Sequence, residues 1–223
     1  MTLSAIQIHK LRTAIENYCF PPAYYDFNQD VPACFDNMAE VETKVKKDLL
    51  SNHFHTVKNG LSNVLYWGYA RMGIRNTRVA RFRQKVTTKQ LSETIHLFSQ
   101  SLSPSLIQIK KIELPEFSGV SFVSKIRMFL DPTNSVTLDF QIMKINQECP
   151  DSILANVHVS KKSTQINITK TNSLAYEAWC KKNRSISDQY YSSLYRAVDV
   201  ERGFFQLIQC NQVKLAGEIL KNA

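Results

Sequence analysis

Glycine is scarce in this chain of 223 residues, which contains only six. No two glycines lie closer than five residues, and neither G-x-G-x-x-G nor G-x-x-x-x-G-K-[ST] occurs. The sequence therefore excludes a dinucleotide-binding turn and a phosphate-binding loop, and with them a Rossmann-type dehydrogenase and a nucleotide-driven motor. The six glycines are Gly60, Gly68, Gly73, Gly119, Gly203 and Gly217.

Cysteine pairs and long apolar runs are also lacking. The five cysteines are widely spaced and no C-x-x-C pair occurs, so we predict no metal site and no cofactor. No run of about 18 apolar residues occurs, and Lys10 and Arg12 interrupt the apolar residues near the N-terminus. We therefore expect neither a membrane span nor a signal peptide, and a cytoplasmic protein with reduced thiols.

The composition is that of a folded protein, with 43% hydrophobic and 21% charged residues. The length suits one compact unit over residues 1–223, or two lobes. Apolar residues recur mostly at helical spacing, so we predict a mainly α protein, a multi-helix bundle of about ten helices. Only in residues 157–168 do apolar and polar residues alternate as in strands, and we predict a small β-hairpin there with its turn at 161–164.

Proline and capping residues predict several helix boundaries. Pro21 and Pro22 should end the first helix, and the aromatic stretch 18–35 should be irregular. Ser103 is expected to cap a helix over 104–113, and a further helix should run from 121 to 130. Apolar spacing from Tyr191 to Ile208 predicts one last long helix.

The most unusual segment has no acidic residue. Between Asp48 and Glu93 the chain carries eight cations, which account for most of the net charge of +9. Their spacing places several on one helical face, or on two faces if the chain bends at Gly73. Such a stripe favours a phosphate backbone as partner, because neutralising phosphates releases condensed counterions. The eight cations are Lys58, Arg71, Arg75, Arg78, Arg81, Arg83, Lys85 and Lys89.

Two aromatic residues, Tyr66 and Trp67, are interleaved with these cations. Aromatic side chains beside cations can stack on unpaired bases, so both are candidates for base stacking. The alternative is that they belong to the hydrophobic core. Arg71, Arg75, Arg78, Arg81 and Lys85 are the candidate contacts to the backbone of DNA, with RNA as an open alternative.

Residues 114–121, Leu-Pro-Glu-Phe-Ser-Gly-Val-Ser, lie between two predicted helices, and Leu138-Asp139-Phe140 follows. This pattern resembles the helix-hairpin-helix/Gly-Pro-Asp (HhH-GPD) superfamily of DNA glycosylases, and is similar to a divergent bacterial branch of it. The resemblance implies a helix-hairpin-helix plus aspartate core over 104–145. Backbone amides at Gly119, Val120 and Ser121 would meet a DNA phosphate, with a monovalent cation as an optional companion. The family has a second glycine where this chain has Ser121, which could instead cap the helix.

The same resemblance suggests residues for catalysis. Asp139 would stabilise a cationic sugar or orient water while the target base is flipped out of the duplex. A glycosylase that also nicks the strand uses a lysine, but the matching position here holds Val123, and Lys125 would serve only if the alignment slips. A monofunctional enzyme is therefore favoured over a lyase. Asp139 could also simply cap its helix.

Three functions remain in competition. The first is a DNA-binding protein of the base-excision type that cleaves an N-glycosidic bond. The second is a non-catalytic nucleic-acid-binding module on the same fold, which the altered hairpin and the missing lysine favour. The third is a protein-interaction protein whose basic face meets an acidic partner.

Overall fold

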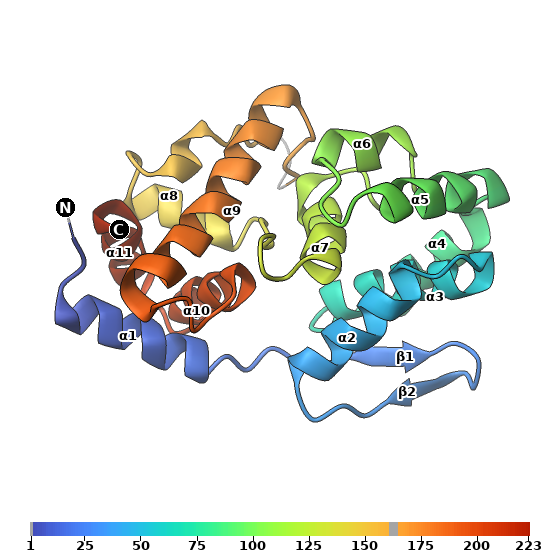
Figure 1. The fold of residues 1–223 in the computed structure, drawn as a ribbon, viewed down its shortest axis with the longest axis horizontal. Helices are drawn as coiled ribbons and strands as arrows, with labels where there is room; N and C mark the ends of the chain where they lie inside the picture. The colour runs from blue at the N-terminus through green and yellow to red at the C-terminus, as the bar shows by residue number, and fades with distance from the viewer. Residues whose placement is uncertain (1, 161–164) are drawn as a thin grey trace. The chain divides into compact units, whose positions relative to one another are not determined.

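The structure, a computed structural model, describes residues 2–160 and 165–223. It is mainly helical, as the apolar periodicity predicts, and the described residues form eleven α-helices and one two-stranded antiparallel hairpin (Figure 1). Contacts within the chain define two units. The middle of the chain, Phe20–Asp131, forms one, and both ends, Met1–Cys19 and Pro132–Ala223, form the other.

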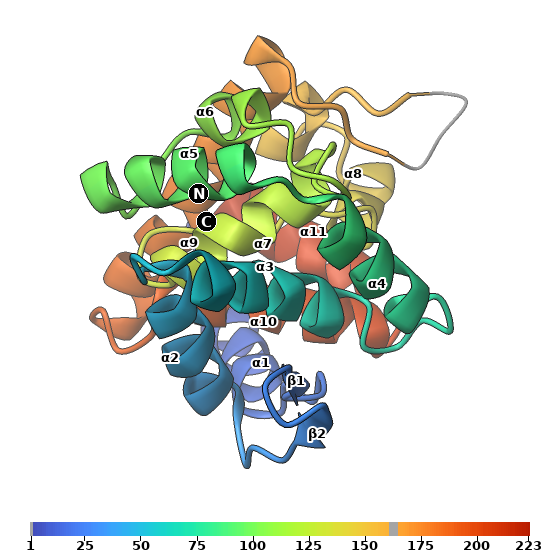
Figure 2. The same ribbon diagram turned by 90° about the vertical axis from the view of Figure 1, so that its right-hand side faces the viewer.

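The unit at 20–131 is built around one buried helix. Helix α3 carries Val57, Leu61, Val64 and Leu65, all fully buried, and packs against its neighbours α2, α4, α5 and α7 (Figure 2). Its elements are β1 (Tyr24–Asp26), β2 (Val31–Ala33), α2 (Met38–Leu49), α3 (Phe54–Gly68), α4 (Arg75–Lys85), α5 (Thr88–Gln100), α6 (Leu106–Lys111) and α7 (Val120–Leu130).

The small hairpin of this unit lies in the aromatic stretch that was expected to be irregular. Tyr24 pairs with Ala33 and Asp26 with Val31. The buried amide of Asn63 on α3 holds the hairpin, since its Oδ1 accepts from the Tyr25 N–H at 2.8 Å and its Nδ2 donates to the Tyr25 carbonyl at 3.1 Å. The backbone N–H and carbonyl of Tyr25 both have partners, which allows so short a ribbon to persist.

The unit made from both chain ends consists of helices and loops, and its described residues form no strand. Helix α1 buries Leu11 and Ala14, and it packs along α10. Trp179 and Tyr176 on α9 donate hydrogen bonds to the carbonyls of Thr137 and Val136, which anchors the preceding loop. Its elements are α1 (Ala5–Glu16), η1 (Ile142–Lys144), α8 (Ile145–Glu148), η2 (Ile153–Asn156), α9 (Lys170–Tyr191), α10 (Ala197–Gln209) and α11 (Val213–Asn222).

Two predicted boundaries are wrong, and a predicted hairpin lies partly outside the described residues. Ser105 rather than Ser103 caps α6. Its hydroxyl accepts from the Gln108 backbone N–H, and the Gln108 side chain accepts from the Ser105 backbone N–H. The single helix expected over Tyr191–Ile208 is two helices, since Ser192 and Ser193 adopt left-handed backbone angles that end α9. The turn of the hairpin predicted at 157–168 lies outside the described residues, and its described flanks contain no strand beyond an isolated bridge at Asn167.

Candidate nucleic-acid interface

Helix α4 carries most of the cations of the acid-free segment. Val79 and Phe82 form its buried face, and the Phe82 ring meets the edge of Phe117 with centroids 5.6 Å apart. The opposite positions hold arginine and lysine because that face points to solvent. Arg71 precedes the helix, in the turn where the chain bends between Gly68 and Arg75. The cations therefore occupy a turn and a helix rather than one continuous helical face.

Two of these arginines are bound by an acid that lies outside the segment. Arg78 Nη1 is 2.9 Å from Glu116 Oε2, and Arg81 Nη1 is 3.4 Å from Glu116 Oε1. The Glu116 side chain is only 7% exposed, and its hydrogen bond to Arg78 raises the pKa of that guanidinium. The segment contains no acidic residue, but in the folded structure the Glu116 side chain, from the turn before α7, contacts its arginines on α4.

Two other arginines lie over aromatic rings. The guanidinium of Arg71 is 5.0 Å from the centroid of Phe20, and that of Arg75 is 4.1 Å from the centroid of Tyr66. A ring positions a cation without cancelling its charge. Within the part of the chain that the structure describes, neither Arg75 nor the exposed Lys85 forms an ion pair with a carboxylate. Arg75 and Lys85 thus present positive charge that an external anion could neutralise.

The two candidates for base stacking differ in their surroundings. Trp67 is 4% exposed, its indole N–H donates to the Met38 sulfur at 3.1 Å, and the rings of Phe20 and Phe129 pack edge-on against it. Trp67 is therefore a core residue in this structure. Tyr66 is 5% exposed but lines a surface pocket, with Arg75 over its ring.

The turn between α6 and α7 has the expected position but not the expected backbone. Gly119 is the N-cap of α7 with φ −119°, an extended conformation that any residue adopts. The left-handed residues are Glu113 and Glu116, with φ of 57° and 68°. Val120 is fully buried, and Ser121 lies inside α7 and does not cap it. Glycine is thus not required here by backbone conformation.

Lys125 and Asp139, the candidates for catalysis, both have visible local partners. Lys125 is 6% exposed, and its Nζ donates to the Ser121 carbonyl one turn earlier at 3.0 Å. Asp139 Oδ1 accepts from the backbone N–H groups of Gln141 at 2.9 Å and Ile142 at 3.3 Å. Asp139 therefore caps the turn that leads into η1, as its position in the sequence suggests. Lys125 belongs to the unit at 20–131 and Asp139 to the other.

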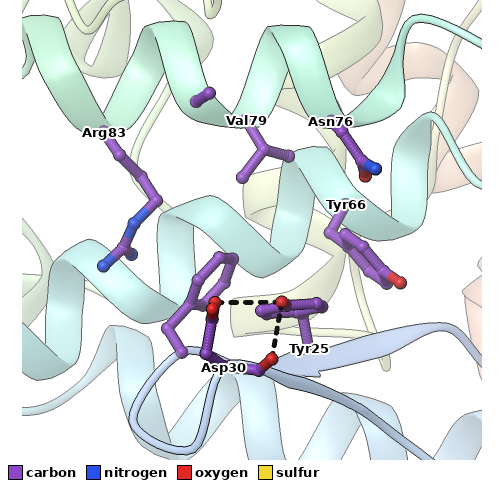
Figure 3. Close-up of a pocket in the computed structure, with 8 residues that line it drawn as sticks. Tyr25, Asp30, Tyr66, Asn76, Val79 and Arg83 are labelled. Carbon is purple, nitrogen blue, oxygen red and sulfur yellow. Dashed lines mark hydrogen bonds between the residues drawn. The ribbon is translucent and has the colours of Figure 1, made fainter.

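A pocket of about 310 Å³ lies where the hairpin meets α3 and α4, and the sequence did not point to it (Figure 3). It contains three aromatic rings, a carboxylate, an amide and a guanidinium within one unit. The sequence had singled out Tyr66 and Arg83 separately and shown a high density of aromatics between 18 and 35, but nothing in it brought these residues together. Its lining residues are Tyr25, Phe27, Asp30, Tyr66, Asn76, Val79, Ala80 and Arg83.

Comparison of the chain with protein-family models, with curated protein sequences and with solved structures finds no match. Function therefore has to be inferred from the residues themselves. Among the described residues, no three histidine, cysteine, aspartate or glutamate side chains are grouped to hold a metal ion. The described helices also include none that has the length and apolar character needed to cross a membrane.

Proposed function

We propose that this chain is a DNA-binding protein that grips the phosphate backbone through α4 and the turn before it. The observation that carries the proposal is the segregation of charge within the unit at 20–131. That unit has 15 basic and 10 acidic residues, yet residues 49–92 hold eight of the cations and none of the acids. An excess of positive charge gathered on one helix, which Glu116 offsets only in part, attracts a polyanion far more than the same charge spread evenly.

The contact of Glu116 with α4 supports the proposal further. It places the turn between α6 and α7 beside Arg78 and Arg81, so the backbone of that turn and the cations of α4 share one neighbourhood. This is the kind of arrangement that a helix-hairpin-helix protein would use to hold a phosphate. The finer part of the proposal is that the protein is of the base-excision type, with Asp139 essential for cleavage of an N-glycosidic bond.

The binding test compares two double variants of equal charge. Arg75→Ala with Lys85→Ala removes two cations that no described carboxylate neutralises, whereas Lys181→Ala with Lys214→Ala removes two exposed lysines outside the unit. Affinity for a labelled duplex is measured across a salt series. Each lost phosphate contact should flatten the salt slope by about one unit, so the α4 pair should flatten it by up to about two and the control pair by none.

Two results would contradict the proposal. Equal effects of the two double variants would mean that net charge alone attracts DNA. Absence of binding even at low salt would favour an acidic protein as the partner of the basic face. A competing RNA of the same length shows which nucleic acid is preferred. Arg78 and Arg81 are less suitable targets, because Glu116 already neutralises part of their charge.

The excision test uses damaged and undamaged duplexes analysed on a denaturing gel after alkali. Alkali-sensitive cleavage that Asp139→Asn abolishes, with binding unchanged, would support a glycosylase. Asparagine keeps an oxygen that can accept from Gln141 and Ile142, so the turn should survive the change. Cleavage before alkali would instead implicate Lys125. Salt-dependent binding with intact strands would identify a non-catalytic module.

A further inference from the structure

The pocket between the hairpin, α3 and α4 has walls of two kinds. Figure 3 shows Arg83, Val79 and Asn76 projecting from α4 on one side, with Tyr25 and Asp30 on the hairpin facing them and Tyr66 on α3 closing one end. All these residues belong to the unit at 20–131.

The aromatic part of the wall is pre-arranged. The ring centroid of Tyr25 lies 4.9 Å from that of Phe27 and 5.3 Å from that of Tyr66, so the three rings form a continuous apolar surface. Tyr25 is held in place because its hydroxyl donates to the Asp30 carbonyl at 2.9 Å and contacts Asp30 Oδ1 at 3.0 Å. Asp30 adopts a left-handed backbone, φ 58°, which turns its carboxylate toward Tyr25. The three rings are therefore held in fixed positions before a ligand binds, with Arg75 over Tyr66 and Arg83 over Phe27.

The cationic part of the wall is also fixed. The Arg83 guanidinium lies 4.1 Å from the Phe27 centroid, and its Nη1 donates to Asn59 Oδ1 at 2.9 Å and to Ser62 Oγ at 3.1 Å. These hydrogen-bond partners are neutral and orient the cation. Burial lowers the pKa of Arg83 from its ordinary value, while the Asp30 carboxylate stabilises the charged form and so acts to raise that pKa. The guanidinium stays charged at neutral pH.

One polar group at the pocket has no partner of its own. The Asn76 side chain extends from the first turn of α4 toward Tyr66 (Figure 3), and it makes no hydrogen bond with any other residue that the structure describes. An amide offers both donors and an acceptor. The Asn76 amide and the Asp30 carboxylate could form hydrogen bonds with the edge of a flat ligand whose faces contact the rings.

We infer that this pocket receives a nucleobase, and that its normal source is an unpaired base of the strand whose backbone follows α4. This inference rests on the proposed function for that source. A base combines a flat π face with donors and acceptors on its edge, which matches rings, amide and carboxylate. The stacked cations Arg75 and Arg83 flank the pocket where the attached phosphates would lie. The volume of about 310 Å³ lies in the range of small-ligand pockets.

The test uses two duplexes of equal length, one fully paired and one with a single unpaired base, bound to the full-length protein. The duplex with the unpaired base should bind about 10-fold more tightly, since stacking one base contributes about 1–3 kcal/mol. Phe27→Leu and, separately, Asn76→Ala should remove most of this preference and leave the affinity for the paired duplex unchanged. Asn76 is exposed on α4, so that variant should fold even if Phe27→Leu disturbs the hairpin.

A second measurement separates failure of the inference from failure of the proposed function. Amide resonances of the pocket residues are followed by NMR while adenosine monophosphate or inorganic phosphate is added. The nucleotide but not phosphate could shift the resonances of Phe27 and Asn76 in a protein that binds no duplex. This result would reject DNA binding and identify the pocket as a site for a free nucleotide. DNA binding with no preference for the unpaired base, or a preference that neither variant reduces, would overturn the inference.

Discussion

Asp199 shows at the scale of one residue how a partly buried carboxylate ties stability to pH. Arg196 contacts it through Nη2 at 2.7 Å and Nε at 2.9 Å, and Arg202 Nη1 lies 3.5 Å away. Burial works to raise the pKa of Asp199, but the hydrogen bonds and charge of Arg196, helped by Arg202, outweigh it, and the pKa is lowered. The carboxylate is therefore stabilised in the folded state.

This lowered pKa has a testable consequence in acid. The stabilisation is fully present above the unfolded pKa of about 4 and is lost as the pH falls through the lower folded value. Asp199→Asn should lower the melting temperature at pH 7, and the gap to the native protein should narrow below about pH 4. Asp151→Asn is the control, because that side chain is 80% exposed. A gap that stays constant from pH 7 to pH 2.5 would contradict the prediction.

Gly203 is the residue that lets α1 approach α10 closely. A Cβ there would lie 2.6 Å from Ile15 Cγ1 and 2.9 Å from Leu11 Cδ1, too close for either side chain to stay in place. We expect Gly203→Ala to reduce the free energy of unfolding by about 1–3 kcal/mol in denaturant titration. Gly73→Ala is the matched control, since no atom lies within 4 Å of its added Cβ and its φ is not positive. That change should be neutral or stabilise by about 0.4–1 kcal/mol. Equal losses in the two variants would rule out the packing explanation.

At the scale of elements, Glu116 couples the turn before α7 to α4. Its carboxylate competes with any external anion for Arg78 and Arg81. If the proposed function is right, Glu116→Gln should tighten DNA binding at moderate salt and steepen the salt slope by up to about two units.

The same change should cost about 1 kcal/mol of stability, because it weakens an ion pair whose arginines are 37% and 45% exposed. Binding across a salt series and a denaturant titration measure both effects. Weaker DNA binding in a variant that stays folded would mean that the carboxylate assists the interface. Glu113→Gln, in the same turn and also with a left-handed backbone, serves as the control.

Local periodicity was enough to predict most helices. Proline and capping residues located α7 to within one residue at each end, because they interrupt helices whatever the burial of the residues between them. The break between α9 and α10 could not be predicted, because its left-handed residues are Ser192 and Ser193. Such a break is usually recognised in a sequence by a glycine, and none occurs here. The hairpin at 24–33 was missed because Asn63, 38 residues further along the chain, supplies the bonds that hold Tyr25.

The candidate site likewise has a part that the local sequence predicts and a part that depends on distant residues. Charge spacing alone was enough to predict that the cations of α4 share an exposed surface. The pairing of Glu116 with Arg78 spans 38 residues, and the pocket joins a hairpin to two helices, so neither leaves a local pattern. Likewise, the burial of Trp67 depends on Phe20, Met38 and Phe129, which come from separate parts of the chain.

At the scale of the whole molecule, the unit at 20–131 is one continuous piece of chain with its own buried residues. We expect a polypeptide of residues 20–131 to be helical by circular dichroism and to melt cooperatively. The polypeptide 132–223 is the contrasting case, because it lacks α1 and with it Leu11 and Ala14, which α10 needs as packing partners. A cooperative transition in 132–223 but not in 20–131 would refute this expectation.

The partnership of α1 with α10 also sets an order of events during synthesis. Helix α1 packs along α10, and the hydroxyl of Tyr191, the last residue of α9, donates to the carbonyl of Ile8 across 183 residues. A ribosome adds about 5–20 residues per second, so α1 waits about 10–40 seconds for α10 to emerge. The middle of the chain is meanwhile complete and can fold between them. Helix α1 is therefore made long before the helix that buries it, and its apolar face is open to chaperones until α10 arrives.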